Sequence, residues 1–137
     1  MTVRAILVAA ISLNLLGGCD AVALVPIPFS KLPLVNVVSF PDGQVYELTG
    51  DLVIMTNRSS SFTVASQDGD IACSGTADNK GIGAVVCNGG LTIPIHIPKE
   101  KFGKFNGSYV DQQPDFRVAT GWGKEADLSL LKGMLGL

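Results

Sequence analysis

The stretch that most constrains the fold is residues 70–90, in which Cys73 and Cys87 flank a turn signal. Asp78-Asn79-Lys80-Gly81 is typical of a type I turn, because Asp is favoured at its first position and Gly at its fourth. With a three-residue loop from Asn79 to Gly81, counting outward places Cys73 opposite Cys87. Facing positions bring Cβ atoms to about 4.5–5.5 Å, near disulfide reach. We therefore predict a hairpin closed by a Cys73–Cys87 disulfide, with two unpaired buried cysteines as the alternative.

Neighbouring turn signals select the same face of the predicted sheet. The dipeptide Asp68-Gly69 predicts a tight hairpin in which Val64 faces Cys73 and Phe62 faces Gly75. Six side chains of three strands then point to one side: Phe62, Val64, Ile71, Cys73, Val85 and Cys87. Agreement between independent turns is stronger than any single propensity.

The segment 91–97 alternates between apolar and polar residues, which predicts a strand with one buried face. Leu91, Ile93, Ile95 and Ile97 form its apolar side. Pro94 cannot donate a ladder hydrogen bond, so we expect an edge strand or a bulge there.

The remaining segments complete an expected all-β meander. A strand over 34–40 should end at Pro41-Asp42-Gly43, and Gly50-Asp51 should turn a hairpin between 44–49 and 52–56. That hairpin would place four residues in the core: Tyr46, Leu48, Val53 and Met55. Weaker strands are expected over 105–110 and 116–120, and a short helix over 124–134 that packs through Ala126, Leu130 and Leu131. The predicted fold is a small antiparallel barrel or sandwich with one disulfide-stapled hairpin and a short C-terminal helix.

The start of the chain has the features of an export signal. Arg4 precedes an apolar run, Ala5 to Leu16, that is too short to span a bilayer. The run ends at Leu16-Gly17-Gly18-Cys19, which resembles the lipobox of bacterial lipoproteins. The resemblance implies cleavage before Cys19 and attachment of lipid, including palmitate, to that residue. It also explains why the chain has 3 cysteines, because lipidation uses the one left over by the disulfide.

The lipobox divides the chain into three expected parts: a signal peptide over 1–18, a lipidated proline-rich tether over 19–34 and one β domain over 35–137. Acyl chains on Cys19 would anchor the domain to membrane lipid. We therefore expect a location in the bacterial cell envelope, with the domain facing the periplasm or the exterior. Asp20, which follows the lipidated residue, does not decide between the inner and the outer membrane. A disulfide fits such an oxidising compartment.

Residues able to carry catalysis are few and scattered. His96 is the single histidine and falls on the outward side of its strand, and Ser59 to Ser61 lie in a polar loop with no nucleophile elbow around them. Asp68 and Asp70 lack the further oxygens of a calcium loop. We therefore expect no enzyme, no metal site and no cofactor. A net charge of -2 without a basic cluster also argues against nucleic acid.

Two features are candidates for binding. Trp122, the single tryptophan, lies between glycines, where it could form a stacking platform or a core plug. Lys99, Lys101 and Lys104 form a basic stretch that could contact anionic headgroups or wall polymers, or be an ordinary solvated loop.

The stapled hairpin, with Cys73-Ser74-Gly75-Thr76, Gly81-Ile82-Gly83 and Cys87, is similar to one in small β-rich envelope lipoproteins. This resemblance implies no activity. We expect a non-catalytic binding or structural module whose partner is an envelope protein or wall polymer. The alternative is a periplasmic inhibitor of a wall-degrading enzyme such as lysozyme, since such inhibitors are also small β-barrel lipoproteins with a disulfide.

Overall fold

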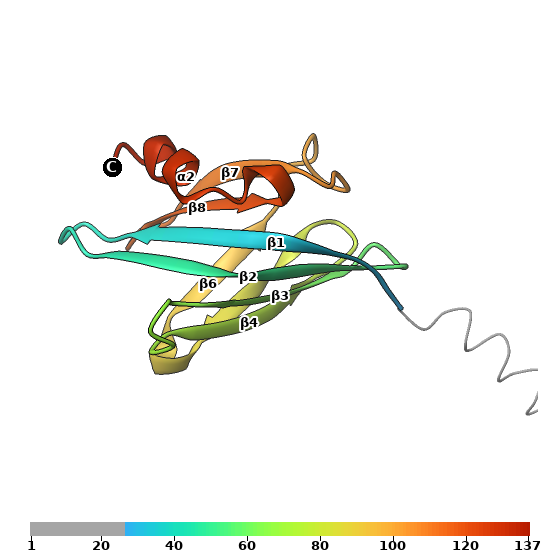
Figure 1. Ribbon diagram of the computed structural model, residues 1–137, viewed down its shortest axis with the longest axis horizontal. Coiled ribbons are helices and arrows are strands. Elements are labelled where there is room, and N and C mark those ends of the chain that lie inside the picture. Colours follow the sequence, from blue (N-terminus) through green and yellow to red (C-terminus); the bar gives the residue numbers. More distant parts are fainter. Residues whose placement is uncertain (1–26) are drawn as a thin grey trace, which may run out of the picture.

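The computed structural model describes residues 27–137, so the expected signal peptide and Cys19 lie outside the described residues. These described residues form an eight-stranded antiparallel sheet that curls into a nearly closed barrel, with one short helix against its outer surface (Figure 1). The strands are β1 (Pro28–Ser39), β2 (Val45–Met55), β3 (Ser60–Ala65), β4 (Ala72–Ala77), β5 (Ile82–Cys87), β6 (Thr92–His96), β7 (Gly107–Gln112) and β8 (Arg117–Trp122). The predicted all-β class is confirmed, as a barrel.

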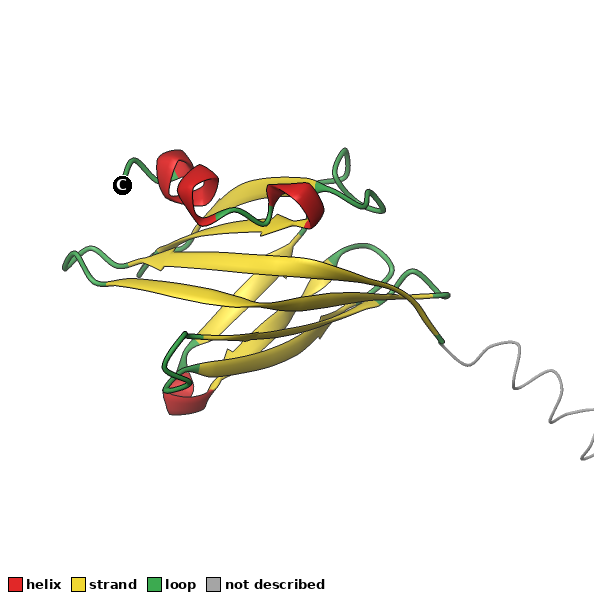
Figure 2. Ribbon diagram, viewed as in Figure 1, coloured by secondary structure: helices red, strands yellow, loops and turns green. Residues whose placement is uncertain are grey.

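The strand order is β6-β5-β4-β3-β2-β1-β8-β7. Strands next to each other in the chain are paired, except β6 and β7, and β1 also pairs with β8 (Figure 2). β6 is one edge of the sheet, as Pro94 predicted, and β7 is the other. The last two strands form the expected hairpin, with β7 two residues later than expected and β8 beginning one residue later and ending two residues later.

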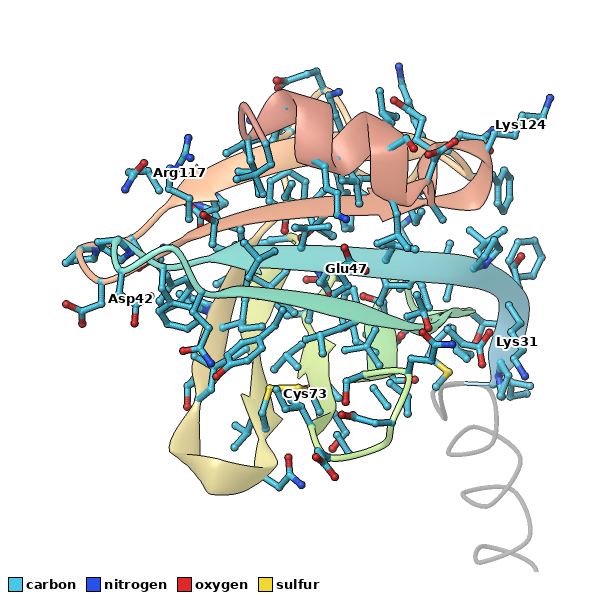
Figure 3. The ribbon with its side chains drawn as sticks, turned by 60° about the vertical axis from the view of Figure 1, so that its left-hand side comes forward. Lys31, Asp42, Glu47, Cys73, Arg117 and Lys124 are labelled. Carbon is cyan, nitrogen blue, oxygen red and sulfur yellow. A yellow bond between two sulfur atoms is a disulfide. The ribbon has the colours of Figure 1, made fainter. Side chains whose placement is uncertain are left out.

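The predicted stapled hairpin is confirmed. Cys73 pairs with Cys87 in the β4–β5 ladder, and their Cα atoms are 3.9 Å apart across the disulfide (Figure 3). Gly81 has a φ of 79°, the left-handed conformation that the loop requires. The Asp78 carboxylate accepts hydrogen bonds from the backbone N–H groups of Ile82 and Lys80, which lower the pKa of Asp78. Turn chemistry therefore sets the register that brings the cysteines together.

The interior of the barrel is one apolar cluster that includes the predicted common face. Phe62, Val64, Cys73, Val85 and Cys87 are all buried, and Ile71 packs partly buried against them. The β3–β4 register is also as predicted, with Val64 opposite Cys73. The apolar side of β6 points into the same cluster, through Ile93, Ile95 and Ile97.

A second apolar cluster lies outside the barrel, beneath helix α2 (Leu128–Met134). Val35, Val37 and Ala119 on β1 and β8 contact Leu131 and Leu135 there. β1 is therefore covered on both sides, which explains its unbroken run of buried residues from Leu34 to Ser39.

The helix differs from its prediction in two respects. It begins at Leu128 and not at Lys124, because the Asp127 carboxylate caps it by accepting the Leu130 N–H at 3.2 Å. A 3-10 turn, η2 (Gly123–Glu125), precedes it. Leu130 is 42% exposed, so its expected packing role was wrong, whereas Leu131 is fully buried as predicted.

The expected hairpin at Gly50-Asp51 was wrong, because β2 runs without interruption through both residues. Gly50 pairs with Leu34 on one side and Val64 on the other. A Cβ at Gly50 would collide with the carbonyl oxygen of Thr63, so glycine permits a close approach of strands and does not form a turn. The continuous strand keeps Tyr46 and Leu48 on the core side.

Beyond Gly50, the core side of β2 carries Leu52 and Ile54. The expected core residues Val53 and Met55 were therefore wrong, since both are only half-buried and neither belongs to the apolar cluster inside the barrel.

The sheet also extends into the expected tether. β1 begins at Pro28, and 28–33 pairs with β2 alone, because pairing with β8 covers only Leu34 to Ser39. Prolines are tolerated on such a one-sided strand because the missing N–H groups face no partner. Residues 27–137 hold the eight strands and both apolar clusters described here, so this part of the chain has the core and the strand partners that it needs to fold on its own.

The first prediction concerns the disulfide. Replacing Cys73 and Cys87 by Ala should lower the free energy of unfolding by roughly 3 kcal/mol, because the unfolded chain is no longer cross-linked. Urea unfolding of residues 20–137, which contain no other cysteine, measures this. The wild-type chain after reduction is the control and should lose a similar amount. Thiols that react before reduction would contradict the pairing.

The second prediction concerns Gly50. Gly50→Ala should destabilise the chain by about 2 kcal/mol, because the new methyl group meets backbone that cannot withdraw. The matched control is Gly133→Ala in α2, where nothing lies within 4 Å of the added carbon. This second substitution should stabilise by up to about 1 kcal/mol through helix propensity. Equal effects of the two substitutions in urea unfolding would show that Gly50 is not a close-contact position.

Candidate functional site

The candidate site is a pocket of about 620 Å³ at the end of the barrel where β1 begins, the right-hand end in Figure 1. Segments far apart in the sequence contribute its walls: the start of β1, the β2–β3 turn, the loop 97–106 and the end of β8. The lining residues are Phe29, Leu52, Ile54, Met55, Thr56, Arg58, Ser60, Ile97, Lys101, Phe102, Gly103, Lys104, Phe105 and Trp122. We call this site the barrel mouth.

The first described residue is fixed at the rim of the barrel mouth. The backbone N–H of Ile27 donates to the Thr56 hydroxyl at 3.1 Å, and the Ile27 carbonyl accepts the Thr56 N–H at 2.9 Å. Thr56 itself lines the pocket. The segment that connects the domain to Cys19 therefore reaches it at the pocket.

The loop 97–106 is held over the mouth at both ends. Its first N–H, from Ile97, donates to the Gly81 carbonyl at 2.9 Å, so the loop is tied to the stapled hairpin. Near its other end, the indole N–H of Trp122 donates to the Lys104 carbonyl at 2.9 Å. A Cβ at Gly107 would overlap the indole ring, so this glycine lets the ring lie against β7.

Trp122 is a buried part of the pocket wall. Only 3% of its surface is exposed, and its ring packs edge-on against Tyr109, with centroids 6.1 Å apart. Of the two interpretations of this residue, the structure has the core plug and not the solvent-facing platform. The buried ring also forms part of the pocket wall at the barrel mouth.

Among residues 27–137, three cations line the pocket, and no carboxylate does. Lys101 and Lys104 come from the predicted basic stretch, whereas Lys99 is exposed outside the lining. Arg58, in the β2–β3 turn, is the third. Among residues 27–137 the ion pairs are Lys31–Asp51 and Lys132–Glu47, so no described acidic side chain neutralises the three cations.

The other residues singled out from the sequence are not gathered in the pocket. His96 is exposed on edge strand β6, and Ser60 is the one member of its serine run in the lining. The Asp68 carboxylate accepts the Ser66 hydroxyl and the Asp70 N–H, which lower its pKa and tie its own turn. Tyr109, which the sequence did not single out, packs on Trp122, and burial raises its pKa to about 12.

Within the described part of the chain, no group of three or more His, Cys, Asp or Glu side chains is placed to hold a metal ion. Among these same residues, none of the helices has the length and apolar character needed to cross a bilayer.

The pocket is an apolar cavity with basic residues in its lining, which is the chemistry of a binding site for an apolar molecule with a negative group.

Sequence reasoning did not include Phe29, Arg58, Phe102 or Phe105 in the site. A local signal existed for two of them, because Lys101-Phe102-Gly103-Lys104-Phe105 interleaves basic and aromatic residues. Phe29 and Arg58 come from distant segments, and only the folded sheet brings them to the mouth.

The third prediction concerns Trp122. Its fluorescence in residues 20–137 should resist quenching by aqueous iodide, because the ring is buried. Unfolding in urea should make the same residue fully quenchable, which is the internal control. Strong iodide quenching of the folded chain would instead indicate an exposed platform.

Comparison with known proteins adds no assignment: no family model matches this sequence, and neither the curated proteins nor the solved structures contain a match. The function is therefore argued from the barrel mouth and from the start of the chain.

Proposed function

We propose that this protein is a lipid-anchored lipoprotein of the bacterial cell envelope that acts as a non-catalytic binding module through the barrel mouth. The observation that carries the proposal is the position of Ile27, which is bonded to Thr56 at the rim of the pocket. Ile27 lies eight positions after Cys19 in the sequence, so an extended chain keeps the mouth within roughly 29 Å of the anchor. A lipid-modified Cys19 would hold the pocket close to the membrane surface.

The chemistry of the pocket supports binding over catalysis. Its lining is mostly aliphatic and aromatic, its ionisable groups are cations, and neither His96 nor any carboxylate is among them. A general base or nucleophile needs a positioned partner, which the lining does not supply.

The lipobox resemblance supplies the anchor. Two or more acyl chains give stable membrane attachment where one gives only marginal binding. An inhibitor of a wall-degrading enzyme remains the alternative function, and pull-down from an envelope extract separates the two. Recovery of a lytic enzyme in stoichiometric amount would favour the inhibitor.

The fourth prediction concerns the anchor. Cys19→Ser in the full chain should abolish lipid attachment, so the protein should keep its signal peptide or appear in the soluble fraction. Mass spectrometry of the N-terminus and membrane fractionation measure the two effects. Cys73→Ser is the matched control, because it removes a cysteine of the disulfide and should leave lipidation intact. A Cys19→Ser protein that is cleaved and still membrane-bound would contradict the proposal.

A further inference from the structure

We propose that the barrel mouth binds a single-chain anionic amphiphile, such as a fatty acid or a lysophospholipid. The acyl chain lies in the pocket against Trp122, and the negative head lies among Arg58, Lys101 and Lys104. This inference rests on the proposed function as a binding module and names the class of its ligand.

The cavity has the size and the lining for an acyl chain. Its volume of about 620 Å³ lies within the range of about 300–1,000 Å³ that small-molecule pockets occupy. Leu52 and Ile54 of β2, which belong to the barrel core, line it, so the pocket is continuous with the apolar interior. Phe102 and Trp122 complete the apolar wall.

The basic residues of the pocket favour a ligand with an anionic head group. Arg58, Lys101 and Lys104 line the pocket without a carboxylate among the lining residues, and none of them is in an ion pair within residues 27–137. Cations that lie beside an apolar cavity complement a ligand with one negative end and one apolar end.

The opening of the pocket exposes apolar surface that such a ligand would cover. Phe29 is 66% exposed and Phe105 is 51% exposed, and their ring centroids lie 6.4 Å apart. Together with the pocket they form one apolar area, and contiguous apolar surface of this kind marks a binding site.

The surface of a bilayer is a poorer match than a single chain. Exposed Ile27 and Phe29 could touch a membrane, but a flat surface would leave the cavity behind them empty. The residue that separates the two occupants is Trp122, because it is buried at the pocket wall and out of reach of a surface contact.

The test uses residues 20–137, which lack the acylated cysteine, and the intrinsic fluorescence of the single tryptophan. The probes are dibrominated stearate and a lysophosphatidylglycerol with a brominated chain, since bromine quenches only an indole that it touches. We expect saturable quenching with one ligand per chain by at least one of them. The affinity should rise about fourfold for each added methylene until the pocket is filled. Comparison of the two probes identifies a carboxylate or a phosphate head.

Variants of one loop supply the matched controls. Lys101→Glu and Lys104→Glu should each weaken binding by about fivefold, whereas Lys99→Glu, outside the lining, should not. Phe105→Ser should weaken binding, whereas Val86→Ser, at an equally exposed position on β5, should leave it unchanged. A brominated monoacylglycerol, which has no charge, should bind more weakly than the anion that gives the stronger quenching.

Three results would overturn the proposal: no saturable quenching by either anion, equal effects of Lys99→Glu and Lys101→Glu, or quenching as strong by vesicles of brominated phosphatidylglycerol. The last result would assign the mouth to the membrane surface. Because residues 20–137 carry no anchor, these failures are separate from the outcome of Cys19→Ser. If the full chain is lipidated but residues 20–137 show no quenching, the proposed anchor stands and the proposed ligand is wrong.

Discussion

The pairing of β1 with β8 is the contact on which the rest of this structure depends. Among the strands of residues 27–137, every other pair joins neighbours in the chain, so β1–β8 is the one pairing that unites the long meander with the C-terminal hairpin. It places Trp122 beside Leu34, provides the face on which Leu131 packs, and brings the loop 97–106 to the end where the chain enters. Without it, the barrel mouth would have no wall on the side of Trp122.

Curvature of the sheet is the second requirement for a mouth. Added Cβ atoms at Gly50, Gly75 and Gly83 would each collide with a carbonyl oxygen of a neighbouring strand, so these glycines allow close contacts at which side chains cannot fit. Glycine at such positions permits the tight bends of small barrels. The disulfide joins the two strands of the β4–β5 hairpin, and the turn of this hairpin accepts the first hydrogen bond of the loop 97–106 through the Gly81 carbonyl. The hairpin that the disulfide stabilises therefore also holds one end of the loop at the barrel mouth.

Sequence reasoning succeeded where structure is decided locally. Asp78 to Gly81 determines which residues face each other, and the alternation of residues 91–97 determines the buried side of β6, so both were predicted correctly. It failed at Gly50, because glycine in a turn and glycine at a close strand contact look the same in a sequence. The site was predictable only in part. Lys101, Lys104 and Trp122 were binding candidates from the sequence, whereas Phe29 and Arg58 reach the pocket only because distant strands pair in the folded sheet. Lipidation of Cys19 stays a prediction from the lipobox.

We propose that the barrel mouth is a preformed cavity for one acyl chain with an anionic head. A crystal structure of residues 20–137 grown with lysophosphatidylglycerol would show such a ligand in place. We expect electron density for an acyl chain between Ile54 and Phe102 that ends at Trp122, with the phosphate beside Lys101 or Lys104. A mouth closed by the loop 97–106, or a lipid bound elsewhere on the barrel, would contradict it.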